Sequence, residues 1–90
     1  MAAPERRRTP RFVFTAEVFV LDSAGHPLGR VHSGGAGGML IEVHDVRSLA
    51  NYQFSERTAL ILVEARSGSR TNVSVEIRYV GEEELGVQFV

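Results

Sequence analysis

The chain has 90 residues, of which 43% are hydrophobic and 23% charged, and its formal net charge is −1. This length fits one small domain and argues against a two-lobed enzyme with a cleft between its lobes. Because the sequence contains no Cys, disulfides, thiolate zinc sites and cysteine nucleophiles are excluded, and a cytoplasmic location is expected. No apolar run is long enough to span a bilayer, so no membrane insertion is expected.

The amino-terminal segment concentrates positive charge. Its first eleven residues carry four Arg and one Glu, a net charge of +3, which leaves −4 for the remainder. Pro4, Pro10 and the lack of apolar periodicity argue against a helix or strand before Arg11. We therefore divide the chain into a flexible basic arm, residues 1–11, and a single domain, residues 12–90.

The domain is expected to be all-β. Six segments have the composition or alternation of strands: 12–21, 28–32, 39–43, 58–64, 73–79 and 85–89. The first of them is long and bent. Short polar turns separate the segments and no long helix is indicated, so the sequence predicts a six-stranded antiparallel β-barrel.

Two segments between these strands are less regular. Residues 33–38 read SGGAGG, and so many glycines are expected to lie outside the strands because glycine weakens a strand interior. They fit a flexible hairpin loop, a bulged turn, or a surface where a planar ligand approaches the backbone. Residues 44–57 fit either a loop or a short helical turn capped by Asp45.

The sequence contains no recognisable pattern of a catalytic or metal-binding site. His26, His32 and His44 are scattered without the spacing of metal ligands, and Ser33 lacks the G-x-S-x-G order of a hydrolase. A phosphate loop needs a Lys, which the chain lacks, and a dinucleotide fingerprint needs a helix where 39–43 reads as a strand. We expect no enzyme activity, no catalytic or metal-binding residue and no cofactor.

The order of these features resembles a PilZ domain, the bacterial six-stranded barrel that serves as a receptor for the second messenger cyclic di-GMP. Arg7 and Arg11 match the RxxxR pattern of that family's arm, and a long first strand and a Gly-rich turn running into GGMLIE at 37–42 follow. VEIRYV at 75–80, an acidic turn and LGVQFV at 85–90 are similar to the family's last two strands with their G-x-x-F element. The resemblance covers nearly the whole chain.

The resemblance implies a ligand site that joins the arm to the Gly-rich segment. An Arg guanidinium can bind phosphate bidentately, donate hydrogen bonds to O6 and N7 of guanine, and stack on a base. The family's second motif, D/N-x-S-x-x-G, falls on 33–38. The implied ligand-binding residues are Arg7, Arg8, Arg11, Ser33, Gly35 and Gly38.

This second motif departs from the family's pattern. Ser33 stands at its acidic position and Gly35 at its serine position, while Gly38 matches the final glycine. The alternative register, with Ser33 as the serine, places Val31 at the acidic position and Ala36 at the glycine. Loss of one charge-assisted and one neutral hydrogen bond weakens binding by roughly thirty-fold to over a thousand-fold.

Two functions stay open. In the first, the domain binds cyclic di-GMP through the Arg arm, weakly because of the altered motif, and relays the signal to a partner protein. In the second, the barrel is a degenerate PilZ adaptor that binds no nucleotide and acts by protein–protein interaction, for example in motility. Binding of single-stranded nucleic acid is not expected, because Arg clusters in the arm and Glu82, Glu83 and Glu84 repel phosphate.

Overall fold

The computed structural model describes the backbone of residues 11–12 and all of residues 17–90. One helical segment and seven strands make up this part of the chain. They are β1 (Arg11–Phe12), β2 (Val18–Leu21), β3 (Pro27–Gly35), β4 (Gly38–Val43), the 3₁₀-helix η1 (Val46–Asn51), β5 (Arg57–Glu64), β6 (Arg70–Val80) and β7 (Glu84–Phe89).

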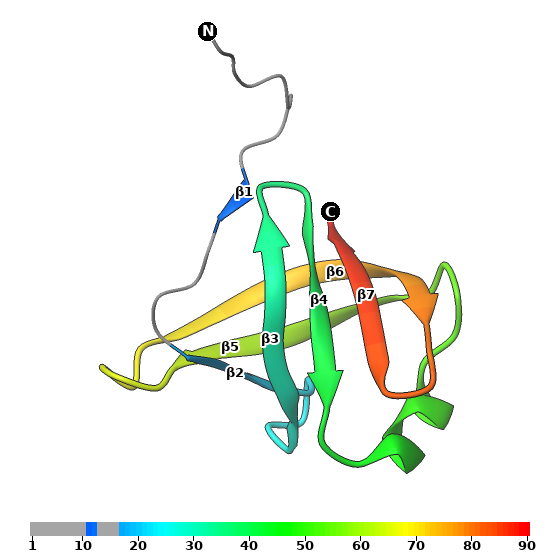
Figure 1. The fold of residues 1–90 in the computed structure, drawn as a ribbon, viewed down its shortest axis with the longest axis horizontal. Coiled ribbons are helices and arrows are strands. Elements are labelled where there is room, and N and C mark those ends of the chain that lie inside the picture. Colours follow the sequence, from blue (N-terminus) through cyan, green and yellow to red (C-terminus); the bar gives the residue numbers. More distant parts are fainter. Residues whose placement is uncertain (1–10, 13–16) are drawn as a thin grey trace, which may run out of the picture.

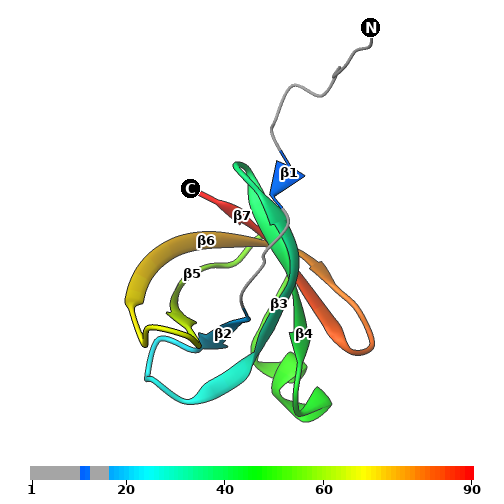
Figure 2. The ribbon, with the colours of Figure 1, turned by 60° about the vertical axis from the view of Figure 1, so that its left-hand side comes forward.

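Six of the strands close into an antiparallel barrel. The order is β3-β2-β5-β6-β7-β4, and β4 pairs back onto β3. In Figure 1, strands β3, β4 and β7 cross the direction of β2, β5 and β6, and Figure 2 shows how strongly β5 and β6 curve. The short strand β1 adds to β3 near the β3–β4 hairpin. The prediction of an all-β chain with a six-stranded antiparallel barrel is confirmed.

Alternation along the strands fills the barrel. Val75 and Ile77 of β6 and Leu85 and Val87 of β7 point inward, while their neighbours point outward, as the period-two pattern predicts. The buried hydrophobic residues are Val20, Leu28, Met39, Ile41, Val43, Leu49, Leu60, Val75, Ile77, Leu85 and Val87. Packing of these side chains is the main source of stability, because hydrophobic burial dominates folding in a chain without cross-links.

Bulges and close backbone contacts let the sheet curve into a barrel. The strand register shifts in β2–β3, in β3–β4 and in β6–β7, where an extra residue bends one strand. A Cβ atom at Gly29 would overlap the carbonyl oxygen of Glu42, and one at Gly38 would overlap that of Val87. Glycine is therefore required where β4 approaches β3 and β7 most closely.

The expectation that residues 33–38 lie outside the strands is wrong. Strand β3 continues through Gly35 and β4 begins at Gly38, so only two residues form the turn between them. Gly34 pairs with Met39 of β4 and with Phe12 of β1. Pairing on both sides offsets the conformational freedom of the glycines, which local composition alone could not reveal.

The expected single strand over 12–21 consists of two separate strands. Both β1 and β2 pair antiparallel with β3, β1 at its carboxyl end and β2 at its amino half. Residues 13–16, which the expected strand included, lie outside the described residues. The segment 44–57 contains the capped turn: the Asp45 carboxylate accepts a hydrogen bond of 3.0 Å from the Arg47 N–H, and Leu49 of η1 is buried. The helical alternative for this segment is confirmed.

Candidate ligand-binding site

The start of the domain lies beside the Gly-rich hairpin. Arg11 pairs with Gly35 and Phe12 pairs with Gly34 in the β1–β3 ladder. Twenty-four positions in the sequence separate Arg11 from Gly35, yet the ladder makes their backbones neighbours. The backbone of Arg11 is thus adjacent to the glycine-rich segment 33–38. Arg7 and Arg8 lie outside the described residues.

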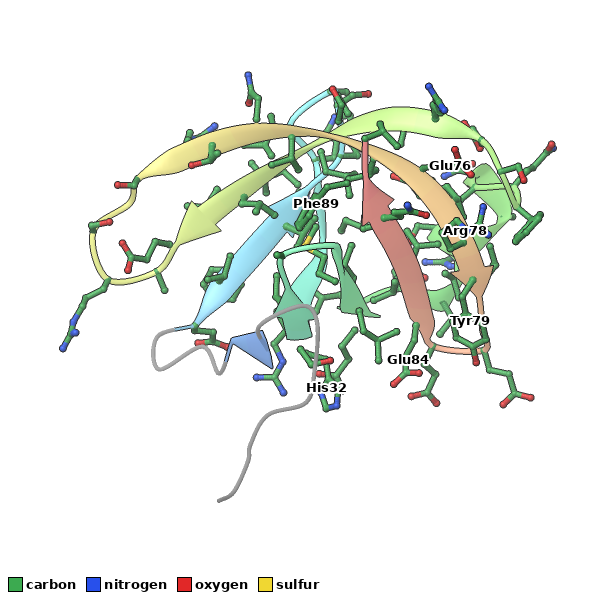
Figure 3. The ribbon with its side chains drawn as sticks, turned by 90° about the horizontal axis from the view of Figure 1, so that it is seen from above. His32, Glu76, Arg78, Tyr79, Glu84 and Phe89 are labelled. Carbon is green, nitrogen blue, oxygen red and sulfur yellow. The ribbon has the colours of Figure 1, made fainter. Side chains whose placement is uncertain are left out.

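A β-bulge in β3 shapes the surface next to this pair. Val31 pairs with the buried Ile41 and points inward, whereas Ser33 pairs with Leu40 on the outer face. His32 is the extra residue between them, so His32 and Ser33 are both exposed on the outside. In Figure 3, His32 points away from the barrel on the side where β1 lies. Strict alternation after the inward Val31 would have placed His32 outward and Ser33 inward, so the exposure of Ser33 depends on the bulge.

The glycines of the hairpin differ in what they allow. Gly38 pairs with Gln88 of β7, and its hydrogen side chain is required because β7 passes so close. A Cβ atom at Gly37 would meet no atom within 4 Å. Gly35 is the glycine paired with Arg11. The expected role of Gly38 as a ligand contact therefore competes with a packing role, whereas Gly35 stays a candidate contact.

Charged side chains line the outer face of β3 and β4 away from the hairpin, where Glu42 also pairs with Glu84 of β7. Arg30 of β3 donates hydrogen bonds to Glu42 of β4 at 2.8 Å and to Glu17 at 3.2 Å. The hydrogen bond and charge of Arg30 lower the pKa of Glu42 below its ordinary value, and the charges of His32 and His44 act in the same direction. These two ion pairs fix the orientation of Arg30 and balance much of its charge, so Arg30 is not readily available to bind a phosphate.

Negative charge gathers at the amino end of β7, away from the β3–β4 hairpin. The turn at 81–84 carries three Glu, and together with Tyr79 and Val80 it lines a hollow of about 560 Å³. At the other end of β7, the Phe89 N–H donates to the Gly37 carbonyl, which places that end beside the hairpin. The acidic turn and the hairpin are therefore about 20 Å apart, the length of a six-residue strand. Tyr79 and Glu84 mark the acidic end in Figure 3.

Among residues 17–90, no group of three or more His, Cys, Asp or Glu is placed to hold a metal ion. The described part of the chain also has no helix long and apolar enough to cross a membrane. What the arrangement offers chemically is a polar surface at a glycine-rich hairpin, whose backbone pairs with that of Arg11. Such a surface suits binding of a small anionic ligand.

The chain matches no protein-family model, and a search of curated proteins finds no match either.

Proposed function

We propose that this chain is a PilZ-type bacterial signalling module that binds cyclic di-GMP through its Arg arm and relays the signal to a partner protein. The observation that supports this most is the pairing of Arg11 with Gly35, because it brings together the two segments that the resemblance implies in ligand binding. A nucleotide at the hairpin would meet Arg11 at its backbone position, with Arg7 and Arg8 preceding it on the arm.

The chemistry of the surrounding surface is compatible with this ligand. Cyclic di-GMP offers phosphates and guanine edges, which guanidinium groups recognise by bidentate hydrogen bonds and stacking. Ser33 is exposed and can donate or accept one hydrogen bond. The acidic turn at 81–84 is far enough from the hairpin for its repulsion of phosphate to be weakened by salt, because the separation exceeds the Debye length of about 8 Å at physiological ionic strength.

The test is calorimetric titration of the purified chain with cyclic di-GMP. Saturable heat at micromolar to submillimolar ligand, reduced at least about tenfold in affinity in an Arg7→Ala, Arg11→Ala double variant, supports the proposal. An Arg47→Ala, Arg66→Ala double variant removes the same charge from elsewhere and is expected to bind as the unaltered chain does. Absence of heat up to about 1 mM ligand, a limit that corresponds to a binding free energy weaker than about −4 kcal/mol, would contradict the proposal.

A second candidate function, an adaptor that acts by protein–protein contact, is favoured by one observation. Phe19 and Val63 pair with each other on the outside of the barrel, on the face opposite to the buried Val20 and Leu62 side. These side chains are half-buried, and an apolar outer surface that is open to solvent in part is typical of protein interfaces. Under this alternative, the Arg7→Ala, Arg11→Ala variant keeps its affinity for a partner protein, unless the arm itself forms the docking surface.

A further inference from the structure

Strands β2 and β5 are apolar on both faces. Val20 pairs with Leu62 toward the core, whereas Phe19 with Val63 and Leu21 with Ile61 form the outward-facing pairs. These four outward side chains are only half-buried. We call them the β2–β5 outer face. A strand that is apolar on both sides is typical of a strand covered on both sides, so this face is suited to a contact with protein.

A crevice of about 230 Å³ opens on the β2–β5 outer face. Its lining includes Phe19, Leu21, Pro27, His44, Val63 and Arg70. Pockets for small-molecule ligands usually measure about 300–1,000 Å³, so this crevice is better matched to one large side chain of a protein. Arg70 stands exposed at its rim and forms no ion pair with any other residue that the structure describes. An apolar side chain followed by a carboxylate would therefore complement it.

The chain itself carries such a side chain on a rigid turn. Phe54 is 62% exposed and lies in the turn from Gln53 to Glu56, closed by the Glu56 N–H donating to the Gln53 carbonyl at 3.0 Å. Within the turn, Ser55 has φ of 74°, the one positive φ among the described non-glycine residues. Such a conformation costs free energy and persists where surrounding contacts hold it, which often marks a functional position.

Contacts to β6 hold this turn in place. The Ser55 N–H donates to the Ile77 carbonyl at 2.7 Å, and the Ile77 N–H donates to the Glu56 carbonyl at 2.8 Å. The Arg78 guanidinium lies 5.3 Å from the centre of the Phe54 ring. The turn thus presents an aromatic side chain outward in a fixed position. The exposed Glu56 follows two residues further on, and one of its carboxylate oxygens accepts a hydrogen bond of 2.9 Å from the Gln53 N–H, which leaves the other oxygen for a partner. Little conformational entropy remains to be lost when Phe54 binds in a pocket.

One molecule cannot place its own Phe54 in its own crevice. Phe54 contacts Arg78 near the carboxyl end of β6, whereas the crevice is lined by Arg70 at the beginning of β6. Eight residues, about 26 Å measured along the curved strand, separate the two positions. Strand β6 spans the molecule in Figure 1, and Figure 3 marks Arg78 near one of its ends.

We propose that the β2–β5 outer face binds the Phe54 turn of a second copy of this chain, with Phe54 in the crevice and Glu56 facing Arg70. Because the two contacting surfaces differ, the contact is heterologous and joins molecules head to tail in a ring or a short chain rather than in a closed dimer. A contact built on one anchoring side chain belongs to the weak, transient class of interfaces. It does not depend on nucleotide binding.

Sedimentation equilibrium of the full chain, carried to about 1 mM, tests this proposal because weak association is populated only at such concentrations. The unaltered chain is expected to show a weight-average mass that rises with concentration. Phe54→Ala and Val63→Glu, which remove the inserted side chain and block the crevice, are each expected to stay monomeric. Val46→Ala is a matched control, since Val46 is another exposed apolar side chain at 51%, and it is expected to associate normally.

Mixing the two variants gives the decisive result. Phe54→Ala keeps an intact crevice and Val63→Glu keeps an intact Phe54, so an equimolar mixture is expected to form one-to-one dimers and nothing larger. Arg70→Glu, at an exposed position, repeats the crevice test should Val63→Glu fail to fold. A monomeric unaltered chain at every concentration would overturn the proposal. Unchanged association of Phe54→Ala would overturn it too, because the β2–β5 outer face would then bind another surface.

Discussion

Two outer faces of the same barrel are built in contrasting ways. Around the β3–β4 hairpin, the outside is polar and rich in glycine, with Ser33 and His32 exposed. Further along β3, Arg30 is held between two carboxylates. On β2 and β5, the outside is apolar, with Phe19 and Val63 paired there. Both faces cover the same hydrophobic core. The comparison shows that the core determines the barrel, while the outward residues determine what each side can bind.

The largest effect is expected from contrasting the two faces of β5. Leu60→Ala removes a fully buried side chain and should lower the free energy of unfolding by about 2–5 kcal/mol. Ile61→Ala, one residue further on and facing outward, should cost about 1 kcal/mol, because Ile61 is only half-buried. Urea denaturation of both variants measures the difference. Equal losses of unfolding free energy in the two variants would show that the outer face of β5 is as well packed as its core face, which would contradict the difference between the two faces.

A contrast of two adjacent glycines tests the packing of the hairpin. Gly38→Ala should lower the free energy of unfolding by about 1–3 kcal/mol, since its Cβ would overlap the backbone of Val87. Gly37→Ala is the matched control and should change stability by less than about 0.5 kcal/mol, because its Cβ meets open space. The urea midpoints of the two variants measure this difference in stability. A harmless Gly38→Ala would contradict the packing role of this glycine between β4 and β7.

The cap of η1 should contribute less. Asp45→Ala removes the acceptor for the Arg47 N–H and should lower the free energy of unfolding by about 1 kcal/mol. Asp45→Asn keeps a side-chain oxygen for the cap and should retain most of that stability. Thermal unfolding followed by circular dichroism compares the two. If Asn were as harmful as Ala, the ion pair between Asp45 and Arg47, rather than the cap, would be what matters.

The smallest effect concerns acid stability. Hydrogen bonds from Arg78 and Arg57 lower the pKa of Glu76 in the folded chain. A lowered folded pKa stabilises the chain above the ordinary Glu pKa of about 4.3, and this stability is lost as the pH falls through the folded value. Glu76→Gln should therefore flatten the loss of stability below about pH 4.5. Gln88→Asn, opposite Glu76 in β7, is the uncharged control and should leave the acid profile unchanged. An unaltered acid profile in Glu76→Gln would contradict this account.

Much of the fold follows from local pattern. The alternation over 73–79 predicts one inward face of β6, and the apolar run in β5 predicts a strand, because these signals need only the neighbouring residues. Local pattern could not predict three other features: the continuation of β3 through Gly35, the bulge at His32, and the separation of β1 from β2. Each depends on which strand pairs alongside, a property of the whole barrel.

The spatial arrangement of the candidate site could not be predicted, for the same reason. The spacing of Arg7 and Arg11 and the glycine-rich stretch are visible in the sequence, but their proximity is not, because it arises from the pairing of Arg11 with Gly35. The packing requirement at Gly38 also became visible only with β7 in place. Whether a glycine is required for packing or for ligand binding can therefore be judged only when the positions of the neighbouring strands are known.

The most direct test of the central claim is an NMR titration of the ¹⁵N-labelled chain with cyclic di-GMP. We expect saturable shifts of the amide signals at positions 11–12 and 32–38, and unchanged amide signals of Phe19, Leu21, Ile61 and Val63. Ligand binding to a largely pre-formed site perturbs mainly the groups that it contacts. Absence of shifts up to about 1 mM ligand, or shifts confined to the β2–β5 outer face, would contradict the claim that the hairpin beside β1 is the nucleotide site.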